Sequence, residues 1–355
     1  MRSRIAKGLI GIGLLVAVVF VTATFLDTTE RPPEFDPPGY LVTDMTVPGR
    51  AAPVRLHIWY PTDSKAAAQL VGQNGLFYGS SMRRNVTPLA KPLPVVVFSH
   101  GSGGNAERLG WLAGYLAHLG MIVAAPDHPG TTSGDSEPAQ TPLIWQRTDD
   151  LTAALDLLQN APPGGLQPDM SRVAVLGFSL GGYTALGLAG VRVTRAAFID
   201  HCKADPAAVD CAWMVAAGVD FNAIDATRYD ASHADARVKA VVAVDPALVD
   251  AVDRGSLAGL SVPFLLINLG DAASLPSGMT ASVIAAGLPD AQYKMIAGSA
   301  HFSFLSECST LGKIIIGLTG EDNICSDWGL RDRVVIQGEL RGLIGGFLTR
   351  QFGLP

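Results

Sequence analysis

The stretch RVAVLGFSLGGYTALGL, residues 172–188, decides the fold that this sequence predicts. Its first part, Arg172–Gly177, is typical of a buried strand, and Leu180–Leu188 is predicted to be a helix. The turn between them, GFSLG at residues 177–181, has the G-x-S-x-G pattern, whose glycines let the strand and the helix approach each other closely. A serine on such a turn points its hydroxyl into the cleft at the carboxyl edge of a sheet. We therefore expect Ser179 to be a nucleophile; the alternative is a tight strand-to-helix turn without chemistry.

Buried strands and helices alternate through the rest of the chain. The first two predicted strands alternate apolar and polar residues like an antiparallel hairpin, whereas the later ones are continuous apolar runs. We expect strands at Leu41–Val47, Val54–Tyr60, Leu93–Ser99, Met121–Ala125, Val238–Val244, Pro263–Asn268 and Gln292–Ile296, and helices at Glu107–His118, Leu143–Leu158 and Arg333–Thr349. The pattern predicts the α/β class, with a mostly parallel central sheet covered by helices on both faces in one domain over residues 39–355.

One segment, residues 190–237, interrupts this alternation. It lies between the helix that follows the G-x-S-x-G turn and the strand Val238–Val244, and it is too long for a simple connection. We interpret it as an insertion, which forms either a cap over the site or a surface elaboration.

The N-terminus differs from the body of the chain. Three basic residues among the first seven precede an apolar run that ends in small residues. This pattern predicts that residues 1–26 are a signal peptide or an N-terminal membrane anchor. Four prolines within residues 27–38 then predict a stiff, extended linker. We therefore expect an exported protein, periplasmic or secreted, that associates with the membrane if this segment is retained.

Composition excludes two broad classes. Hydrophobic residues make up 48% of the 355-residue chain, which is too many for a disordered protein. The 26 Lys and Arg residues against 32 Asp and Glu give a net charge of −6, so the sequence predicts no nucleic-acid partner.

The four cysteines fall into two local pairs. Cys202 and Cys211 lie in the insertion, and Cys308 and Cys325 lie near the C-terminus. Two local disulfides are the simplest of the three possible pairings, and they suit an exported protein. Metal binding is the alternative, but the chain has no C-x-x-C pair, and His201 directly adjoins Cys202, which is not a usual ligand spacing.

A serine nucleophile needs hydrogen-bond donors for the oxyanion and a base. The backbone N–H of Leu180 is one expected donor, and Ser102 N–H in the glycine-rich loop HGSGG (residues 100–104) is the other. In this kind of sheet the order along the chain is serine, acid, histidine. Only His201, His233 and His301 follow Ser179, and the first two lie in the insertion. We therefore predict His301 as the base.

The acid has two candidates on residue evidence. Asp245 ends the strand Val238–Val244, and Asp271 lies just beyond the next strand. Either carboxylate could orient the imidazole and stabilise its protonated form. The residues alone leave the choice even. Arg147 and Asp150, on the helix Leu143–Leu158, are interpreted as a structural charge pair.

Several motifs together resemble a known group of proteins. Over about Leu56–Phe304 the chain is similar to the α/β-hydrolase superfamily, and within it to the plasma-type platelet-activating-factor acetylhydrolases and to bacterial proteins labelled predicted dienelactone hydrolases. The motifs that carry the resemblance are IWYP (58–61), FSHG (98–101), APDHPG (125–130), GFSLGG (177–182), AVD (243–245) and GSAH (298–301). The resemblance implies Asp245 as the acid, with Asp271 as second choice, and the oxyanion donors at Ser102 and Leu180. True dienelactone hydrolases use a cysteine nucleophile, whereas position 179 is serine here, so the resemblance implies an ester hydrolase.

These patterns predict an exported serine hydrolase that cleaves carboxylic esters of a small-molecule or lipid substrate, without metal or cofactor. The pocket is expected between the insertion and the loop after His100-Gly101. An amidase or peptidase with the same triad is the alternative enzyme, and a non-catalytic binding module on a hydrolase fold is the alternative from another class.

Overall fold

The computed structural model describes residues 34–271, 273, 275–319, 324–327 and 331–355. The predicted signal peptide or anchor, residues 1–26, lies outside the described residues, as does most of the predicted linker. Within the described ranges, no helix is both long and apolar enough to cross a membrane.

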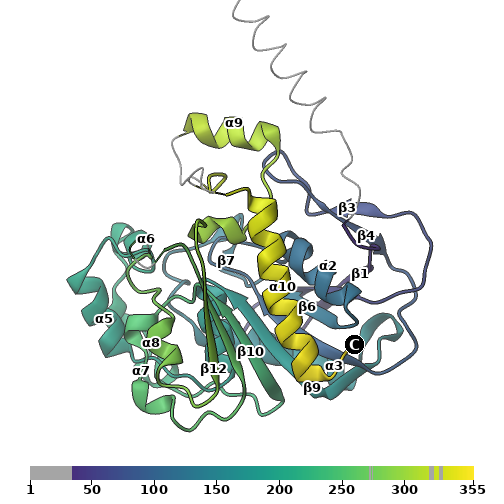
Figure 1. Cartoon of the computed structure of the whole chain (residues 1–355). Helices are drawn as coiled ribbons and strands as arrows, with labels where there is room; N and C mark the ends of the chain where they lie inside the picture. The colour runs from purple at the N-terminus through teal and green to yellow at the C-terminus, as the bar shows by residue number, and fades with distance from the viewer. Residues whose placement is uncertain (1–33, 272, 274, 320–323, 328–330) are drawn as a thin grey trace, which may run out of the picture.

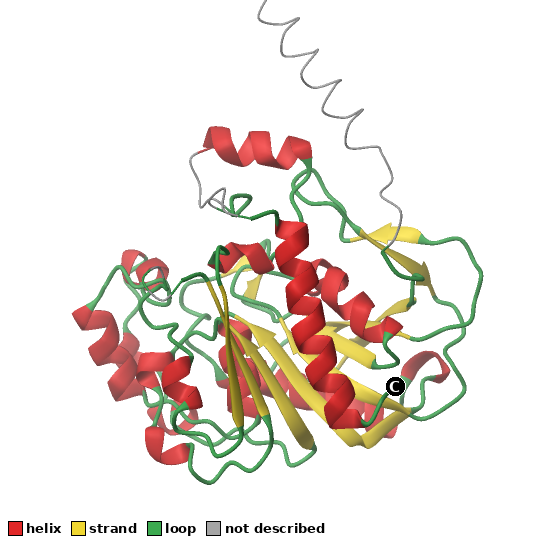
Figure 2. Cartoon of the chain, in the orientation of Figure 1, coloured by secondary structure: helices red, strands yellow, loops and turns green. Residues whose placement is uncertain are grey.

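A large twisted sheet forms the centre of the described chain (Figures 1 and 2). The ten strands lie in the order β12-β11-β10-β9-β5-β6-β2-β1-β4-β3. From β12 to β6 all neighbours are parallel, whereas β2 is antiparallel to both β6 and β1. The strands are β1 Gly39–Met45, β2 Val54–Tyr60, β3 Gln69–Val71, β4 Ser80–Arg84, β5 Leu93–Ser99, β6 Ile122–Pro126, β9 Pro168–Phe178, β10 Val238–Val244, β11 Phe264–Leu269 and β12 Ala291–Ile296. The predicted mostly parallel sheet and its antiparallel opening hairpin are confirmed.

Helices cover both faces of this sheet because its inner strands are apolar on both sides. In β9, Val173 and Val175 pack into one core cluster and Ala174 and Leu176 into the other, as the two-residue period of a strand requires. The first cluster lies under α3, α4 and α8, and the second under α2 and α10, which Figure 1 shows crossing the sheet. The helices are α2 Gly110–His118, α3 Trp145–Asn160, α4 Leu180–Leu188, α8 Ser282–Ala285 and α10 Arg333–Phe352; α9, Thr310–Thr319, projects from the body.

The segment 190–237 forms three short helices gathered on one side of the molecule (Figure 1). These are α5 Arg195–Ala204, α6 Ala212–Ala216 and α7 Ala226–Tyr229. Their buried side chains form a third apolar cluster together with Trp145, Leu180 and Met279 from the main body. We call these three helices and their loops the cap.

Both predicted local disulfides are present. Cys202 is bonded to Cys211 within the cap, and Cys308 is bonded to Cys325 next to α9.

Candidate active site

Ser179 sits on a sharp turn between β9 and α4. Its backbone has φ 57° and ψ −123°, a conformation that is strained for a residue with a side chain. The turn is fixed by neighbouring backbone, because Ser179 N–H donates to Val244 O at 3.0 Å and Ala247 N–H donates to Ser179 O at 3.1 Å. A Cβ on Gly177 would lie 1.8 Å from Gly181 O. The first glycine of the G-x-S-x-G pattern, Gly177, is therefore required, because β9 and α4 approach too closely there for a side chain.

His301 and Asp245 are in direct contact. His301 follows β12 in the short 3-10 helix His301–Phe304, and Asp245 directly follows β10. The two side chains meet with Nδ1 of His301 3.0 Å from Oδ2 of Asp245, and the carboxylate is fully buried. Because Nδ1 donates to this carboxylate, Nε2 is the imidazole nitrogen that can accept a proton. The ring also stacks on Phe178, at 4.7 Å between centroids, which limits its rotation.

The two candidate acids have different surroundings. Asp245 is fully buried against His301, whereas Asp271 is exposed in the loop after β11. Of the two acids between which the residues alone did not choose, Asp245 is the one that contacts His301.

Asn268 is a partner of this acid that the sequence analysis missed. Its Nδ2 and the N–H of Leu269 both donate to Oδ1 of Asp245 at 2.8 Å. The same amide also donates to Met279 O and accepts from Ala281 N–H and from the Tyr293 hydroxyl. A fully bonded, buried amide holds the carboxylate in one orientation. The only signal in the sequence is a single polar residue inside the apolar strand FLLINL, residues 264–269.

The loop after β5 lies against the nucleophile turn, because a Cβ on Gly101 would lie 3.2 Å from Ser179 Cβ. His100 Nδ1 donates to Gly101 O at 2.7 Å, and its Nε2 accepts from His128 N–H at 3.2 Å. Burial lowers the pKa of His100 well below its ordinary value, so the ring is neutral and this tautomer is the one that fits its partners. In a trans peptide the N–H points away from the C=O. Holding Gly101 O therefore directs the N–H of Ser102 to the opposite side.

The second expected donor is the N–H of Leu180, the first residue of α4. The first N–H groups of a helix have no acceptor within the helix, and the helix dipole makes them a favourable site for negative charge. Ser102, Ser179 and Leu180 line the same cavity. His301 and Asp245 form a separate contact, which adjoins Ser179 through Phe178, on which the His301 ring stacks, and through Val244 O, which accepts from Ser179 N–H.

This cavity has a volume of about 80 Å³ and lies between the main body and the cap. Its lining is mostly apolar, and the position agrees with the expected pocket between the insertion and the loop after His100-Gly101. The cap contributes Phe198, Val209, Asp210, Trp213, Met214 and Tyr229 to the lining, and the main body contributes Thr141, Pro142, Ile144, Ala247, Leu248 and Met279 beside the three residues above.

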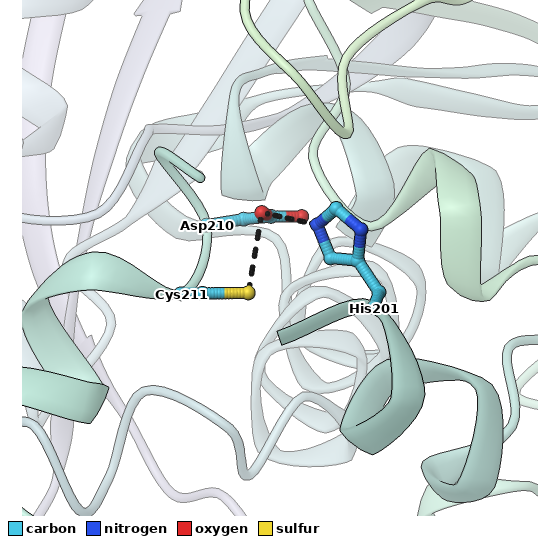
Figure 3. Close-up of side chains that lie close together, drawn as sticks. All are labelled: His201, Asp210 and Cys211. Carbon is cyan, nitrogen blue, oxygen red and sulfur yellow. Dashed lines mark hydrogen bonds and ion pairs between the residues drawn. The ribbon is translucent and has the colours of Figure 1, made fainter. Parts of the chain in front are cut away.

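Three side chains of the cap, His201, Asp210 and Cys211, form a polar cluster (Figure 3). His201 Nε2 lies 3.0 Å from Oδ1 of Asp210, and Leu248 N–H donates to the other carboxylate oxygen at 3.2 Å. Cys211 Sγ also approaches Asp210, at 3.7 Å. His201, Asp210 and Cys211 are residue types that bind metals. The sulfur of Cys211, however, is bonded to Cys202 and offers no thiolate. The carboxylate of Asp210 thus links His201 of α5 to the loop after β10 by hydrogen bonds.

Arg147 and Asp150 do not form the predicted charge pair with each other. Arg147 donates to neutral oxygens around the loop after β5. Asp150 instead accepts hydrogen bonds from Nε and Nη2 of Arg50, at 2.9 and 2.6 Å. The prediction was wrong: the two side chains are three positions apart on α3, but each forms its hydrogen bonds with residues of other elements.

Comparison with known proteins identifies the fold. The family model described as "Serine aminopeptidase, S33" matches residues 90–201. A ferulic acid esterase from Streptomyces cinnamoneus is 19% identical, with a TM-score of 0.61 over 90% of this chain and 92% of the esterase. A dienelactone hydrolase-like promiscuous phosphotriesterase from metagenomic libraries is 15% identical, with a TM-score of 0.51 over 88% of this chain and 98% of that protein. The chain has the fold of the α/β-hydrolase superfamily, as predicted.

Proposed function

We propose that this protein is an exported serine hydrolase that cleaves carboxylic esters of short apolar acids through an acyl-enzyme. The observation that carries the proposal is the contact between Asp245 and His301, whose ring stacks on Phe178 directly before the strained Ser179, together with the apolar cavity that Ser179 lines. The similarity in fold to an esterase supports the class of reaction, and the "Serine aminopeptidase" match supports a serine hydrolase.

In the proposed reaction, Ser179 Oγ attacks the ester carbonyl while Nε2 of His301 takes its proton. Asp245 holds the ring and stabilises the imidazolium that forms. Negative charge develops on the carbonyl oxygen, where the N–H groups of Ser102 and Leu180 donate to it. The imidazolium then gives its proton to the leaving alcohol. Water, deprotonated by the same histidine, attacks the acyl-enzyme and releases the acid.

The shape and lining of the cavity support the acyl preference. Bulky apolar side chains such as Phe198, Trp213 and Met214 line this small cavity of about 80 Å³. A short apolar acyl group gains from burial there, whereas a long chain has to extend past the cap. An anionic acyl group would lose its hydration there, because the described residues of the lining include no Lys, Arg or His side chain to replace it.

Export is supported by the two disulfides. Disulfides form and persist in oxidising compartments such as the periplasm or the medium. Non-reducing peptide mapping of protein taken from the periplasm or medium should link Cys202 to Cys211 and Cys308 to Cys325. Free thiols at these positions would argue against export.

The activity is tested with p-nitrophenyl esters from acetate to laurate, beside aminoacyl p-nitroanilides. We expect turnover of the short esters that Ser179→Ala abolishes. Ser171→Ala is the matched control, because Ser171 lies exposed on the same strand β9. Turnover of the anilides but not of the esters would instead establish the peptidase alternative, which the "Serine aminopeptidase" match favours.

A further inference from the structure

Arg147 is a buried cation behind the proposed active site. It lies in the first turn of α3 and is 2% exposed. The amino end of a helix disfavours a positive charge, because the helix dipole is positive there. Burial lowers the pKa of Arg147 to about 9, so the guanidinium stays protonated at neutral pH. Burial and the helix dipole therefore both destabilise the charged form of Arg147, and its contacts have to offset this cost.

The guanidinium joins three separate segments around the site. Its Nη2 donates to Ser99 Oγ at 3.1 Å and to the carbonyl of His100, at the start of the loop that carries Ser102. Its Nη1 donates to Thr131 Oγ1 at 2.5 Å, in the loop after β6. Its Nε donates to Thr184 Oγ1 at 3.2 Å, in helix α4.

Two of these segments carry the proposed oxyanion donors. Thr184 Oγ1 also donates to Leu180 O, so the arginine reaches the first turn of α4 through one intermediate bond. On the other side, Thr131 O accepts from Gly103 N–H at 2.9 Å, next to Ser102. One planar, rigid guanidinium group therefore binds acceptors in both segments, and this limits how far the N–H of Ser102 and the N–H of Leu180 can move apart.

The charge of Arg147 is not neutralised by a contacting carboxylate. Its four acceptors are neutral oxygens, and the nearby Asp150 is bound bidentately by Arg50. Asp150 also accepts from Nδ1 of His128, whose Nε2 accepts from Ser99 Oγ. Burial lowers the pKa of His128 well below its ordinary value, so this ring is neutral. Arg50, Arg147 and Asp150 together therefore carry one net positive charge, which is buried behind the loop after β5.

We propose that Arg147 is a positioning residue of the oxyanion hole: it fixes the loop after β5 to helix α4, and its positive charge favours the oxyanion. This inference rests on the proposed function, because it needs a reaction in which negative charge develops beside Ser102 and Leu180. A purely structural role would be served as well by a well-packed apolar side chain, since burying a charge is costly.

The experiment compares Arg147→Met and Arg147→Lys with the control Arg83→Met. Arg83 is 8% exposed and donates to Asp36 and to the carbonyls of Pro37 and Ala66, on β4 at the far side of the sheet. Active sites are counted by complete labelling with a fluorophosphonate, so that kcat is expressed per folded site. The second readout is inhibition by a trifluoromethyl ketone, which forms a tetrahedral oxyanion on the serine.

For Arg147→Met we expect kcat to fall by about 10- to 100-fold, as for a misplaced or lost oxyanion donor, with KM within about threefold. The inhibition constant of the ketone should rise by a similar factor, since it reports on the same oxyanion. Arg147→Lys keeps the positive charge but lacks the planar guanidinium group, so its kcat should lie between that of Arg147→Met and that of the wild type. Arg83→Met should lower Tm and leave kcat per site unchanged.

Unchanged kcat per site in Arg147→Met, with only a lower Tm, would overturn the inference and leave the proposed function standing. If Arg147→Met does not fold, Arg147→Lys decides: a loss of kcat at wild-type KM and Tm supports the inference, and full kcat overturns it. Turnover of neither the esters nor the anilides by the wild-type protein would overturn both proposals.

Discussion

A methyl group added at Gly181 should reduce the activity far more than one added at Gly187 of the same helix. A Cβ on Gly181 would lie 2.1 Å from Ser99 O and 2.6 Å from His100 O. Ordinary carbon–oxygen contacts are about 3.3 Å or longer, so the loop after β5 has to move away from α4 by about 1 Å. A displacement of that size at a reacting centre can lower the rate by about 100-fold, and the overpacking costs about 1–3 kcal/mol of stability.

Gly187 provides the matched control. A Cβ there would meet Thr148 Cγ2 at 3.5 Å, an ordinary contact, in the last turn of α4. Replacing a helical glycine by alanine stabilises a protein by about 0.5–1 kcal/mol. We therefore expect Gly187→Ala to have wild-type kcat/KM on p-nitrophenyl butyrate and an equal or higher Tm. If Gly181→Ala keeps kcat/KM within about threefold of wild type, the close approach of this loop to α4 does not set the oxyanion geometry.

Three further results are expected. Asp245→Asn should lower kcat by orders of magnitude while Asp271→Asn keeps most of it, as measured by ester hydrolysis per titrated site; the reverse order would transfer the role of the acid to Asp271. Asn268→Leu leaves one oxygen of the buried acid short of a donor, so both Tm and kcat should fall, by about 1–3 kcal/mol in stability; an unchanged protein would show that the amide does not hold the acid. His100 and His128 are neutral when folded, because burial lowers the pKa of both, and they take up protons near pH 6.5 once unfolded. The stability that these two rings contribute, measured as the free energy of unfolding in urea, should therefore be fully present above about pH 6.5 and be lost below it, by up to about 1.4 kcal/mol per pH unit for each ring. Burial raises the pKa of Asp150 to about 6, which offsets the share of one ring below that pH and leaves a net fall; a flat profile down to pH 5 would contradict this.

The sequence predicted the central elements well because their signals are local. The observed bounds of β2, β5, β10 and α4 agree with the predicted ones, since β2 alternates apolar and polar residues up to a proline and the other three are mostly apolar segments that end at a polar or glycine-containing turn. The short strands β3 and β4 were missed: they lie at the edge of the sheet, are three and five residues long, and carry few apolar residues. The helices of the cap were not placed either, since their four to ten residues bury only part of their surface.

The site was predictable where chain order and a turn motif identify a residue. The order serine, acid, histidine led to His301, and the glycine pattern led to Ser179. The residues alone left Asp245 and Asp271 even and the family resemblance favoured Asp245, because the contact of the acid with His301 joins residues 56 positions apart. The bonds of Arg147 span up to 48 positions, so no local pattern indicates them.

The most direct test of the central claim is to identify the residue that reacts with a fluorophosphonate. After labelling, peptide mapping by mass spectrometry should find one adduct, on Ser179, and Ser179→Ala should not be labelled. His301→Ala should react much more slowly, because the hydroxyl then has no base. An adduct on a different serine, or no adduct in folded wild-type protein, would contradict the account.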